Sequence, residues 1–411
     1  MVRADGAGMA GRDKGMINAP YTLFSRIPLY RAEDGTFYTD DLWEKDLSLH
    51  LNYISQFHIC CPVLPWQAGQ GTDTPILGLQ INQVIPLRHD RGWGSVLANL
   101  LPNALSVFRA AKRGGILHSS GAGWAFPLSY YILLLRPFLS FRWLMVIEST
   151  FWMVPVGCRP SLRKGIAQQL HRTFIRYCLR SADARIFTQD WYRAELLGDS
   201  ENCLIAPASW IDEEFIASAP PPKRPGPLRL IYPTRMVTEK GVDTVLAALA
   251  AYDQTPNAPP LVLDMIGQGP MAEQARAFAA QPTTSVTLRF LDPVPYGPPF
   301  FALLRGYDGV LIANLTEEQP RIAFDAFSQG LPCIASNTSG NASVIYNGET
   351  GHLFAPGDAT DLTALLLRLA AAPDDLAALR RRVLTFAHAH THRAMHRNRE
   401  AFLKTSLGSN L

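Results

Sequence analysis

The sequence predicts an α/β fold in two domains, each a largely parallel β-sheet covered by helices. The chain has 411 residues, which is too long for one ordinary hydrophobic core. Five of the nine residues 219–227 are prolines, and such a segment cannot continue a helix or a central strand. After this segment, short apolar runs alternate with helical patterns, as in βαβ units. We therefore expect domains at 19–218 and 228–375, joined by a linker at 219–227.

The apolar runs of the second domain predict strands, and the segments between them have helical spacing. Strands are expected at 228–232, 261–266, 286–291, 309–313 and 333–335, and helices at 241–252, 271–280, 300–304 and 321–327. The first domain is less regular. Its expected strands lie at 21–24, 58–63, 116–117, 143–147 and 184–187, and its helices at 42–51, 95–111 and 162–179.

The two ends of the chain lie outside the two predicted domains. No apolar segment follows the basic residues of the N-terminus, so residues 1–18 are expected to be a disordered tail without a targeting signal. Residues 376–411 are expected to be helices that pack back on the first domain. Their histidines, at 388, 390, 392 and 396, have no accompanying carboxylate or cysteine, so we expect an exposed helix and no metal.

Composition narrows the class of protein. The hydrophobic fraction of 47% and the charged fraction of 18% are typical of a folded chain, and a net charge of +3 does not point to nucleic acid. Six scattered cysteines without a C-x-x-C pair indicate reduced thiols and a cytoplasmic protein. The most apolar stretch, 127–147, is interrupted by Arg136, Pro137 and Arg142. It predicts a buried helix and a strand, not a membrane span.

The clearest candidate site is the segment 314–326, which follows an apolar strand and opens a helix. Pro320 suits the first helical position, where its missing N–H has no cost. The N–H groups of Arg321 and Ile322 would then point out of the helix end. Together with the helix dipole, they would form a binding site for a phosphate group.

Two carboxylates flank this predicted phosphate site. Glu317 lies in the loop before it, and Asp325 lies about 7.5 Å further along the helix axis at the usual rise per residue. Carboxylates are poor partners for phosphate but good acceptors for hydroxyl groups, so a sugar and a ribose are the expected partners. The alternative is an acidic loop before a capped surface helix.

A second element follows the first strand of the same domain. Arg235 and Lys240 lie in the loop after residues 228–232, where ligands of parallel sheets bind, and both are suited to phosphate oxygens. Gly267 and Gly269 follow the next strand and allow a tight turn, although the third glycine of a dinucleotide fingerprint is missing.

These motifs together resemble the donor-binding domain of the family 4 retaining glycosyltransferases, over roughly residues 228–358. The family's Arg and Lys-Gly after the first strand correspond to Arg235 and Lys240-Gly241. Its Gly-x-Gly-Pro turn corresponds to residues 267–270, and its E-x7-E motif to Glu317-x7-Asp325. The resemblance implies the GT-B fold, in which two Rossmann-like domains face each other across a cleft.

The resemblance also implies a mechanism. Arg235 and Lys240 would neutralise the departing diphosphate, assisted by the N–H groups near Pro320, while Glu317 would contact the transferred sugar and Asp325 the ribose. Transfer would retain the anomeric configuration and would need no metal or other cofactor. The sequence departs from the family at Asp325, which replaces glutamate, and at Ser343, where the family often has another glutamate.

The first domain matches the family only loosely. Family members often present a histidine to the donor sugar. Here the candidates for lining the cleft are His118, in a Ser/Gly-rich loop, and Glu148, after the strand at 143–147. Their alternative roles are those of cap or turn residues.

A basic helical stripe raises the question of a membrane partner. Arg172, Arg176 and Arg180 share one face of the helix at 162–179, and that face could contact an anionic membrane carrying a lipid-linked acceptor. This would place the protein on the inner membrane face; the alternative is a solvated helix face.

Three functions are compatible with these motifs. The main hypothesis is transfer of a sugar from a nucleotide-diphosphate sugar to a glycan or lipid-linked acceptor. A nucleotide-sugar epimerase of the same fold would need acid/base residues that the first domain does not clearly offer. A non-catalytic subunit that binds sugar nucleotides is the third, and the change to Asp325 is the feature that favours it.

Overall fold

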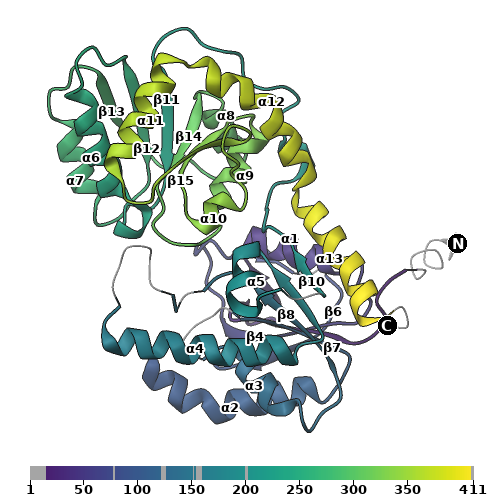
Figure 1. Cartoon of the computed structure of the whole chain (residues 1–411). Coiled ribbons are helices and arrows are strands. Elements are labelled where there is room, and N and C mark those ends of the chain that lie inside the picture. The colour runs from purple at the N-terminus through teal and green to yellow at the C-terminus, as the bar shows by residue number, and fades with distance from the viewer. Residues whose placement is uncertain are drawn as a thin grey trace, which may run out of the picture. The chain divides into compact units, whose positions relative to one another are not determined.

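The structure is a computed structural model, which describes residues 15–76, 79–121, 126–150, 152–153, 160–199 and 202–408. The chain forms two compact units (Figure 1). The first comprises Met1–Trp152, Ile166–Ala206 and His396–Leu411, and the second comprises Met153–Gly165 and Pro207–Met395. The sequence therefore enters the second unit twice, at Met153 and at Pro207, and each time returns to the first.

The first unit contains a ten-stranded sheet in the order β10-β9-β8-β7-β1-β4-β2-β3-β5, with β6 paired to β4. Its strands are β1 (Tyr21–Phe24), β2 (Leu29–Arg31), β3 (Phe37–Thr39), β4 (Phe57–Pro65), β5 (Thr74–Pro75), β6 (Ile81–Leu87), β7 (Ile116–Ser120), β8 (Arg142–Ile147), β9 (Ala184–Phe187) and β10 (Cys203–Ile205). Its helices are α1 (Asp41–His50), α2 (Trp93–Ala111), α3 (Leu128–Leu135), α4 (Leu162–Ser181, from Ile166 onward), α5 (Asp190–Leu197) and the part of α13 (His392–Leu407) that follows Met395.

The crossovers between parallel strands distribute these helices over the two faces of the sheet. The connections β6-α2-β7, β7-α3-β8 and β8-α4-β9 all advance in one direction across the sheet, whereas β1-α1-β4 advances in the other. Because such crossovers are right-handed, α2, α3 and α4 cover one face and α1 covers the opposite face. Figure 1 shows α2, α3 and α4 lying together, away from α1 and α13.

A buried polar cluster attaches α13 to α1. The His396 imidazole lies 3.0 Å from a carboxylate oxygen of Asp46, and Arg399 donates to His50 Nε2 over 2.9 Å. Burial lowers the pKa of His50 to about 3, so its ring is neutral and can accept this hydrogen bond. The expectation of an exposed terminal helix is wrong for His392 and His396, which are both buried.

The second unit contains a six-stranded, entirely parallel sheet in the order β13-β12-β11-β14-β15-β16. Its strands are β11 (Leu228–Pro233), β12 (Leu261–Ile266), β13 (Val286–Leu291), β14 (Gly309–Ile312), β15 (Cys333–Ser336) and β16 (Gly351–Phe354). Its helices are α6 (Val242–Asp253), α7 (Ala272–Ala279), α8 (Pro298–Leu304), α9 (Arg321–Ser328), α10 (Ser339–Ala342), α11 (Ala359–Ala371) and α12 (Asp374–Ala389), with short 3₁₀ turns at Glu213–Phe215 and Thr238–Lys240.

Two hydrophobic cores sandwich this sheet. Side chains from α6, α7 and α11 form one core, and side chains from α8, α9 and α12 form the other. The apolar runs of the sequence correspond to these strands because a parallel sheet is buried on both faces. The strands and helices expected between residues 228 and 335 are confirmed to within a few residues.

Three expected boundaries differ from the structure. The boundary at 375/376 is wrong, because α12 and the residues up to Met395 belong to the second unit, and only the chain from His396 onward belongs to the first. Residues 219–227 do not join the units, because they lie inside the segment Pro207–Met395 of the second unit, and the Pro221 carbonyl accepts a 2.8 Å hydrogen bond from Arg380 of α12. Residues 15–18 are not a tail, because Ile17 is buried and pairs with Ile54. Residues 1–14 lie outside the described part of the chain.

Candidate active site

The candidate site lies where the strand order of the second unit reverses. The chain proceeds from β11 through β12 to β13 on one side and continues with β14 to β16 on the other. The loops after β11 and β14, which are neighbouring strands, therefore diverge at this point. Ligands of open parallel sheets bind in this crevice, at the carboxyl ends of the strands.

A pocket of about 310 Å³ occupies this position. Its walls come from the ends of β11 and β14, the loops that follow them and the first residues of α9. The lining residues are Tyr232, Pro233, Thr234, Arg235, Lys240, Leu311, Ile312, Asn314, Glu318, Gln319, Pro320, Arg321 and Ile322. The structure thus brings together Arg235, Lys240 and the 320–322 segment, which the sequence singled out separately.

Three basic residues line the pocket, Arg235, Lys240 and Arg321, and the first two differ in exposure. Arg235 is exposed, whereas the Lys240 side chain is only 17% exposed and its Nζ lies 3.8 Å from a carboxylate oxygen of Glu318. Burial lowers the pKa of Lys240, Glu318 acts in the opposite direction, and the nearby Arg235 lowers it further. Arg235 and Lys240 therefore give the pocket two neighbouring positive charges with one exposed counterion, an arrangement suited to a polyanion.

A glycine fixes the position of Lys240. Gly241 has φ of 75°, and a Cβ atom there would lie 2.0 Å from the Ala313 carbonyl oxygen. Only glycine therefore allows the loop after β11 to approach the end of β14 so closely. The Tyr232 hydroxyl also donates to the Lys240 carbonyl.

The amino end of α9 completes the pocket. Helix α9 begins at Arg321, so Pro320 occupies the N-cap position and not the first helical position that we expected. The N–H groups of Arg321 and Ile322 belong to the first turn, where intrahelical acceptors are missing. With the helix dipole, they favour an anion in this pocket.

Glu317 is not among the residues that line this pocket, and its expected contact with the transferred sugar stays a prediction. Its carboxylate accepts a 2.5 Å hydrogen bond from the backbone N–H of Ser339, at the start of α10. Helix α10 spans only four residues, too few for a periodic pattern to reveal it in the sequence. Glu318 lines the pocket instead. In the sequence, only its position next to Glu317 indicated that it could belong to the site.

Asp325 also lies outside the set of lining residues. It is buried in α9, where the Tyr296 hydroxyl donates a 2.9 Å hydrogen bond to its carboxylate. Burial raises the pKa of Asp325 to about 7. The expected contact of Asp325 with a ribose stays a prediction, and the Tyr296 hydroxyl is the partner that the structure shows.

Gly267 and Gly269 support the pocket without lining it. Cβ atoms at these positions would lie 1.8 Å from the Thr234 carbonyl oxygen and 2.3 Å from that of Met236. Backbone hydrogen bonds join the same segments, including one of 2.9 Å from the Met236 N–H to the Gln268 carbonyl. The two glycines thus allow the loop after β12 to support the loop that carries Arg235.

The two candidates in the first unit have different surroundings. His118 lies inside β7, not in a loop, and its Nδ1 shares a 2.8 Å hydrogen bond with the Tyr21 hydroxyl. Burial keeps the pKa of His118 well below its usual value, so His118 is a neutral core residue and the expectation that it lines a cleft is wrong. Glu148 follows β8 and is exposed.

The basic stripe of α4 is mostly turned toward its own unit. Arg172 forms an ion pair with Glu195 of α5, and Arg176 donates a 2.8 Å hydrogen bond to the Glu195 carbonyl. Of the three arginines expected to meet a membrane, only Arg180 is exposed. Among the described residues, no helix is both long and apolar enough to cross a bilayer.

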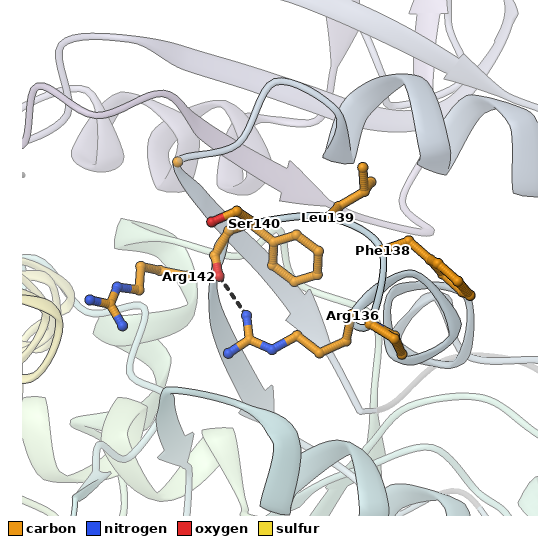
Figure 2. Close-up of a pocket in the computed structure, with 8 residues that line it drawn as sticks. Arg136, Phe138, Leu139, Ser140 and Arg142 are labelled. Carbon is orange, nitrogen blue, oxygen red and sulfur yellow. Dashed lines mark hydrogen bonds between the residues drawn. The ribbon is translucent and has the colours of Figure 1, made fainter.

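A second pocket lies in the first unit and is lined by Gly115 and residues 136–142 (Figure 2). Its volume is about 760 Å³. The pocket lies at the amino end of β8, whereas ligands of parallel sheets bind at the carboxyl ends. Arg136 donates two 2.9 Å hydrogen bonds to Asp183, so its charge is already compensated. The β11–β14 pocket is therefore the better candidate for chemistry.

A match to a known protein family falls within the unit that carries this pocket. Residues 214–383 match the protein family described as Glycosyl transferases group 1. Over 163 residues, the chain is 31% identical to a glycogen synthase of Mycobacterium tuberculosis, a match covering 39% of this chain and 37% of that protein. The chain thus matches little more than a third of that relative's length.

Similarity to solved structures extends over nearly the whole chain. Sucrose-phosphate synthase from Thermosynechococcus elongatus aligns with a TM-score of 0.63 and 17% identity, covering 94% of this chain and 98% of that chain. Anabaena HepE in complex with UDP and glucose aligns with a TM-score of 0.59 and 12% identity, covering 94% and 100%. Identities this low show a shared fold and no more, and they confirm the fold class expected from the sequence. Residues 214–383 therefore match the family Glycosyl transferases group 1, and the chain as a whole shares its α/β fold with sucrose-phosphate synthase and HepE.

Proposed function

We propose that this protein is a family 4 glycosyltransferase that moves a sugar from a nucleotide-diphosphate sugar to a glycan or lipid-linked acceptor, with retention of configuration. The observation that supports this most is the β11–β14 pocket, where Arg235, Lys240 and the amino end of α9 converge. A diphosphate is the polyanion that two cations and a helix dipole would accommodate. Related folds include Anabaena HepE, whose structure contains UDP and glucose.

In the proposed reaction, the bond between the anomeric carbon and the diphosphate breaks while the acceptor hydroxyl attacks from the same face, and the hydroxyl proton passes to the departing diphosphate. Negative charge then builds on the diphosphate, where Arg235 and Lys240 stabilise it more strongly than in the ground state. These two side chains would do what a divalent cation does in metal-dependent transferases, so no metal or other cofactor is proposed. Glu317, whose carboxylate accepts a hydrogen bond from the Ser339 N–H, would contact the transferred sugar.

The test is turnover with a panel of nucleotide sugars, with the anomeric configuration of the product read by NMR. Arg235→Ala and Lys240→Ala should each lower kcat on the true donor at least about a hundredfold, because loss of such a group costs ~3 kcal/mol of barrier. Lys223→Ala is the matched control, since this exposed lysine pairs with Asp374 and does not line the pocket.

The outcomes separate the alternatives. Near wild-type kcat in Lys240→Ala would contradict the leaving-group role of this lysine. An inverted product would contradict retention. An epimerised nucleotide sugar without transfer would identify an epimerase, and tight binding without turnover would identify a non-catalytic subunit.

A further inference from the structure

One face of the first unit is unusual for a protein surface. Helices α2, α3 and α4 lie side by side on the same face of the sheet (Figure 1). Helix α3 contacts α2, and the Tyr130 hydroxyl of α3 shares a 2.9 Å hydrogen bond with His171 of α4. The rings of Tyr130 and Phe174 also lie 5.3 Å apart. The three helices therefore form one continuous layer.

The outer side of this layer is apolar. On α2 and on α4, exposed large side chains recur at intervals of three or four residues, which places them along one stripe of each helix. We call these stripes, with two residues near the end of α3, the apolar face. Its members are Leu97 (72% exposed), Leu101 (69%), Leu105 (48%) and Phe108 (40%) on α2, Ile166 (55%), Leu170 (55%), Phe174 (48%) and Tyr177 (56%) on α4, and Leu134 (67%) and Phe138 (80%).

These stripes are not core residues that happen to be partly open. The opposite side of α2 is buried through Val96, Asn99, Asn103 and Val107, and that of α4 through Ile175, Cys178 and Leu179. Each helix thus already has one side packed on the unit. Scattered exposed leucines are ordinary, but a gathered apolar surface marks an interaction site.

The charge of the same segment indicates the partner. Residues 91–182 contain twelve lysines and arginines but one acidic residue, Glu148, whereas the whole chain has 38 basic and 35 acidic residues. Helices α2, α3 and α4 contain no acidic residue. Arg109, Lys112 and Arg180 are exposed near the ends of the two stripes. A second copy of this face would place like charges together, whereas an anionic lipid surface complements both its charge and its apolar side chains.

We propose that the apolar face docks the first unit on a membrane that contains anionic lipids. Helices α2 and α4 would lie in the plane of the interface, with their apolar stripes inserted among the lipids and the flanking cations at the headgroups. This attachment surface is built from side chains other than Arg172 and Arg176, which bind Glu195. It goes beyond the proposed function, and it does not require that the donor pocket be active.

The proposal is tested by flotation of the full chain with vesicles of phosphatidylcholine alone or mixed with phosphatidylglycerol. Binding is expected with the mixed vesicles and should weaken as salt is added. Leu97→Ser with Leu101→Ser, and Ile166→Ser with Leu170→Ser, should each weaken binding at least about tenfold, because two apolar side chains no longer insert. Ile27→Ser is the matched control, since Ile27 is 44% exposed and lies outside these helices.

Charge is tested in the same assay. Lys112→Glu should weaken binding to the mixed vesicles, whereas Arg381→Glu, an equal charge change at an exposed residue of α12, should not. As a readout that needs no variant, hydrogen exchange of residues 93–111 and 166–181 should slow when vesicles are added, and that of residues 374–389 should not.

Three results would overturn the proposal. They are the absence of binding to either vesicle, binding that the serine variants leave unchanged, and a dimer in the absence of lipid that the serine variants dissociate. Donor hydrolysis without vesicles should be the same in the serine variants and the wild type. Failure of the membrane proposal is thereby distinguished from failure of the proposed function.

Discussion

The buried carboxylate of Asp325 should make the stability of the second unit fall as pH rises. Burial raises its pKa from the usual 3.8 to about 7, although Tyr296 donates a hydrogen bond to it. Between these two values the unfolded chain loses the Asp325 proton and the folded chain keeps it. The unfolded state then binds fewer protons, so the free energy of unfolding decreases across this window.

The size of the effect follows from the pKa difference. About three pKa units correspond to ~4 kcal/mol between pH 4 and pH 8. In an Asp325→Asn variant, the side-chain amide would have the same shape as the carboxyl group, would accept the Tyr296 hydrogen bond and could not ionise. The stability of Asp325→Asn relative to wild type should therefore improve by ~4 kcal/mol from pH 4 to pH 8. For a unit of this size, that is roughly 8–16 °C in relative Tm.

The measurement is thermal unfolding of both proteins at the two pH values, followed by circular dichroism. Asp253→Asn is the control, because the N–H of Ser285 and those of Thr284 and Val286 lower the pKa of the Asp253 carboxyl. Its stabilisation is present above the usual pKa of 3.8 and is lost only as pH falls through the lowered pKa, so this variant should lose a similar amount of stability at pH 4 and at pH 8. A relative stability of Asp325→Asn that stays constant between pH 4 and pH 8 would refute the reasoning.

Three further predictions concern the β11–β14 pocket. Glu318→Gln should lower the KM for the donor about fivefold in initial-rate assays. The reason is that the partly exposed Lys240–Glu318 ion pair, worth up to ~1 kcal/mol, no longer competes with the donor for Lys240. A higher KM would contradict this. Gly267→Ala should destabilise the second unit by ~2–3 kcal/mol in denaturant melts. This loss should be larger than that of Gly348→Ala, because Gly348 has φ of 77° but open space for a Cβ atom. Equal losses would show that φ alone matters. Turnover should survive EDTA, and a loss that manganese or magnesium restores would show that Arg235 and Lys240 do not replace a cation.

Local patterns predicted the elements of the second unit well and the enclosure of its polar groups poorly. Runs such as Leu261–Ile266 are apolar because both faces of the sheet are covered, and this can be read without knowing the partners. The convergence of Arg235, Lys240 and the start of α9 could also be predicted, since loops after neighbouring parallel strands share one edge.

The roles of single polar residues depended on distant partners. His118 and Ser119 resembled the start of a loop, but the Tyr21 hydroxyl and the Trp143 indole N–H bind them within β7. Glu317 and Asp325 matched a motif by spacing, yet Ser339 and Tyr296 are their observed partners. Spacing along the chain cannot show which hydrogen-bond partner a polar side chain has in the fold, because these partners lie 22 to 97 residues away.

The return of the chain to the first unit at His396 has a consequence for biosynthesis. On the ribosome, this unit remains incomplete until Pro207–Met395 has been made, a delay of roughly 10–40 s for about 190 residues. During that time Asp46 and His50 lack His396 and Arg399, which are their hydrogen-bond partners in the folded unit. The second unit, by contrast, needs nothing that is translated later than Met395. The first unit is therefore the one whose synthesis begins first and whose fold is completed last.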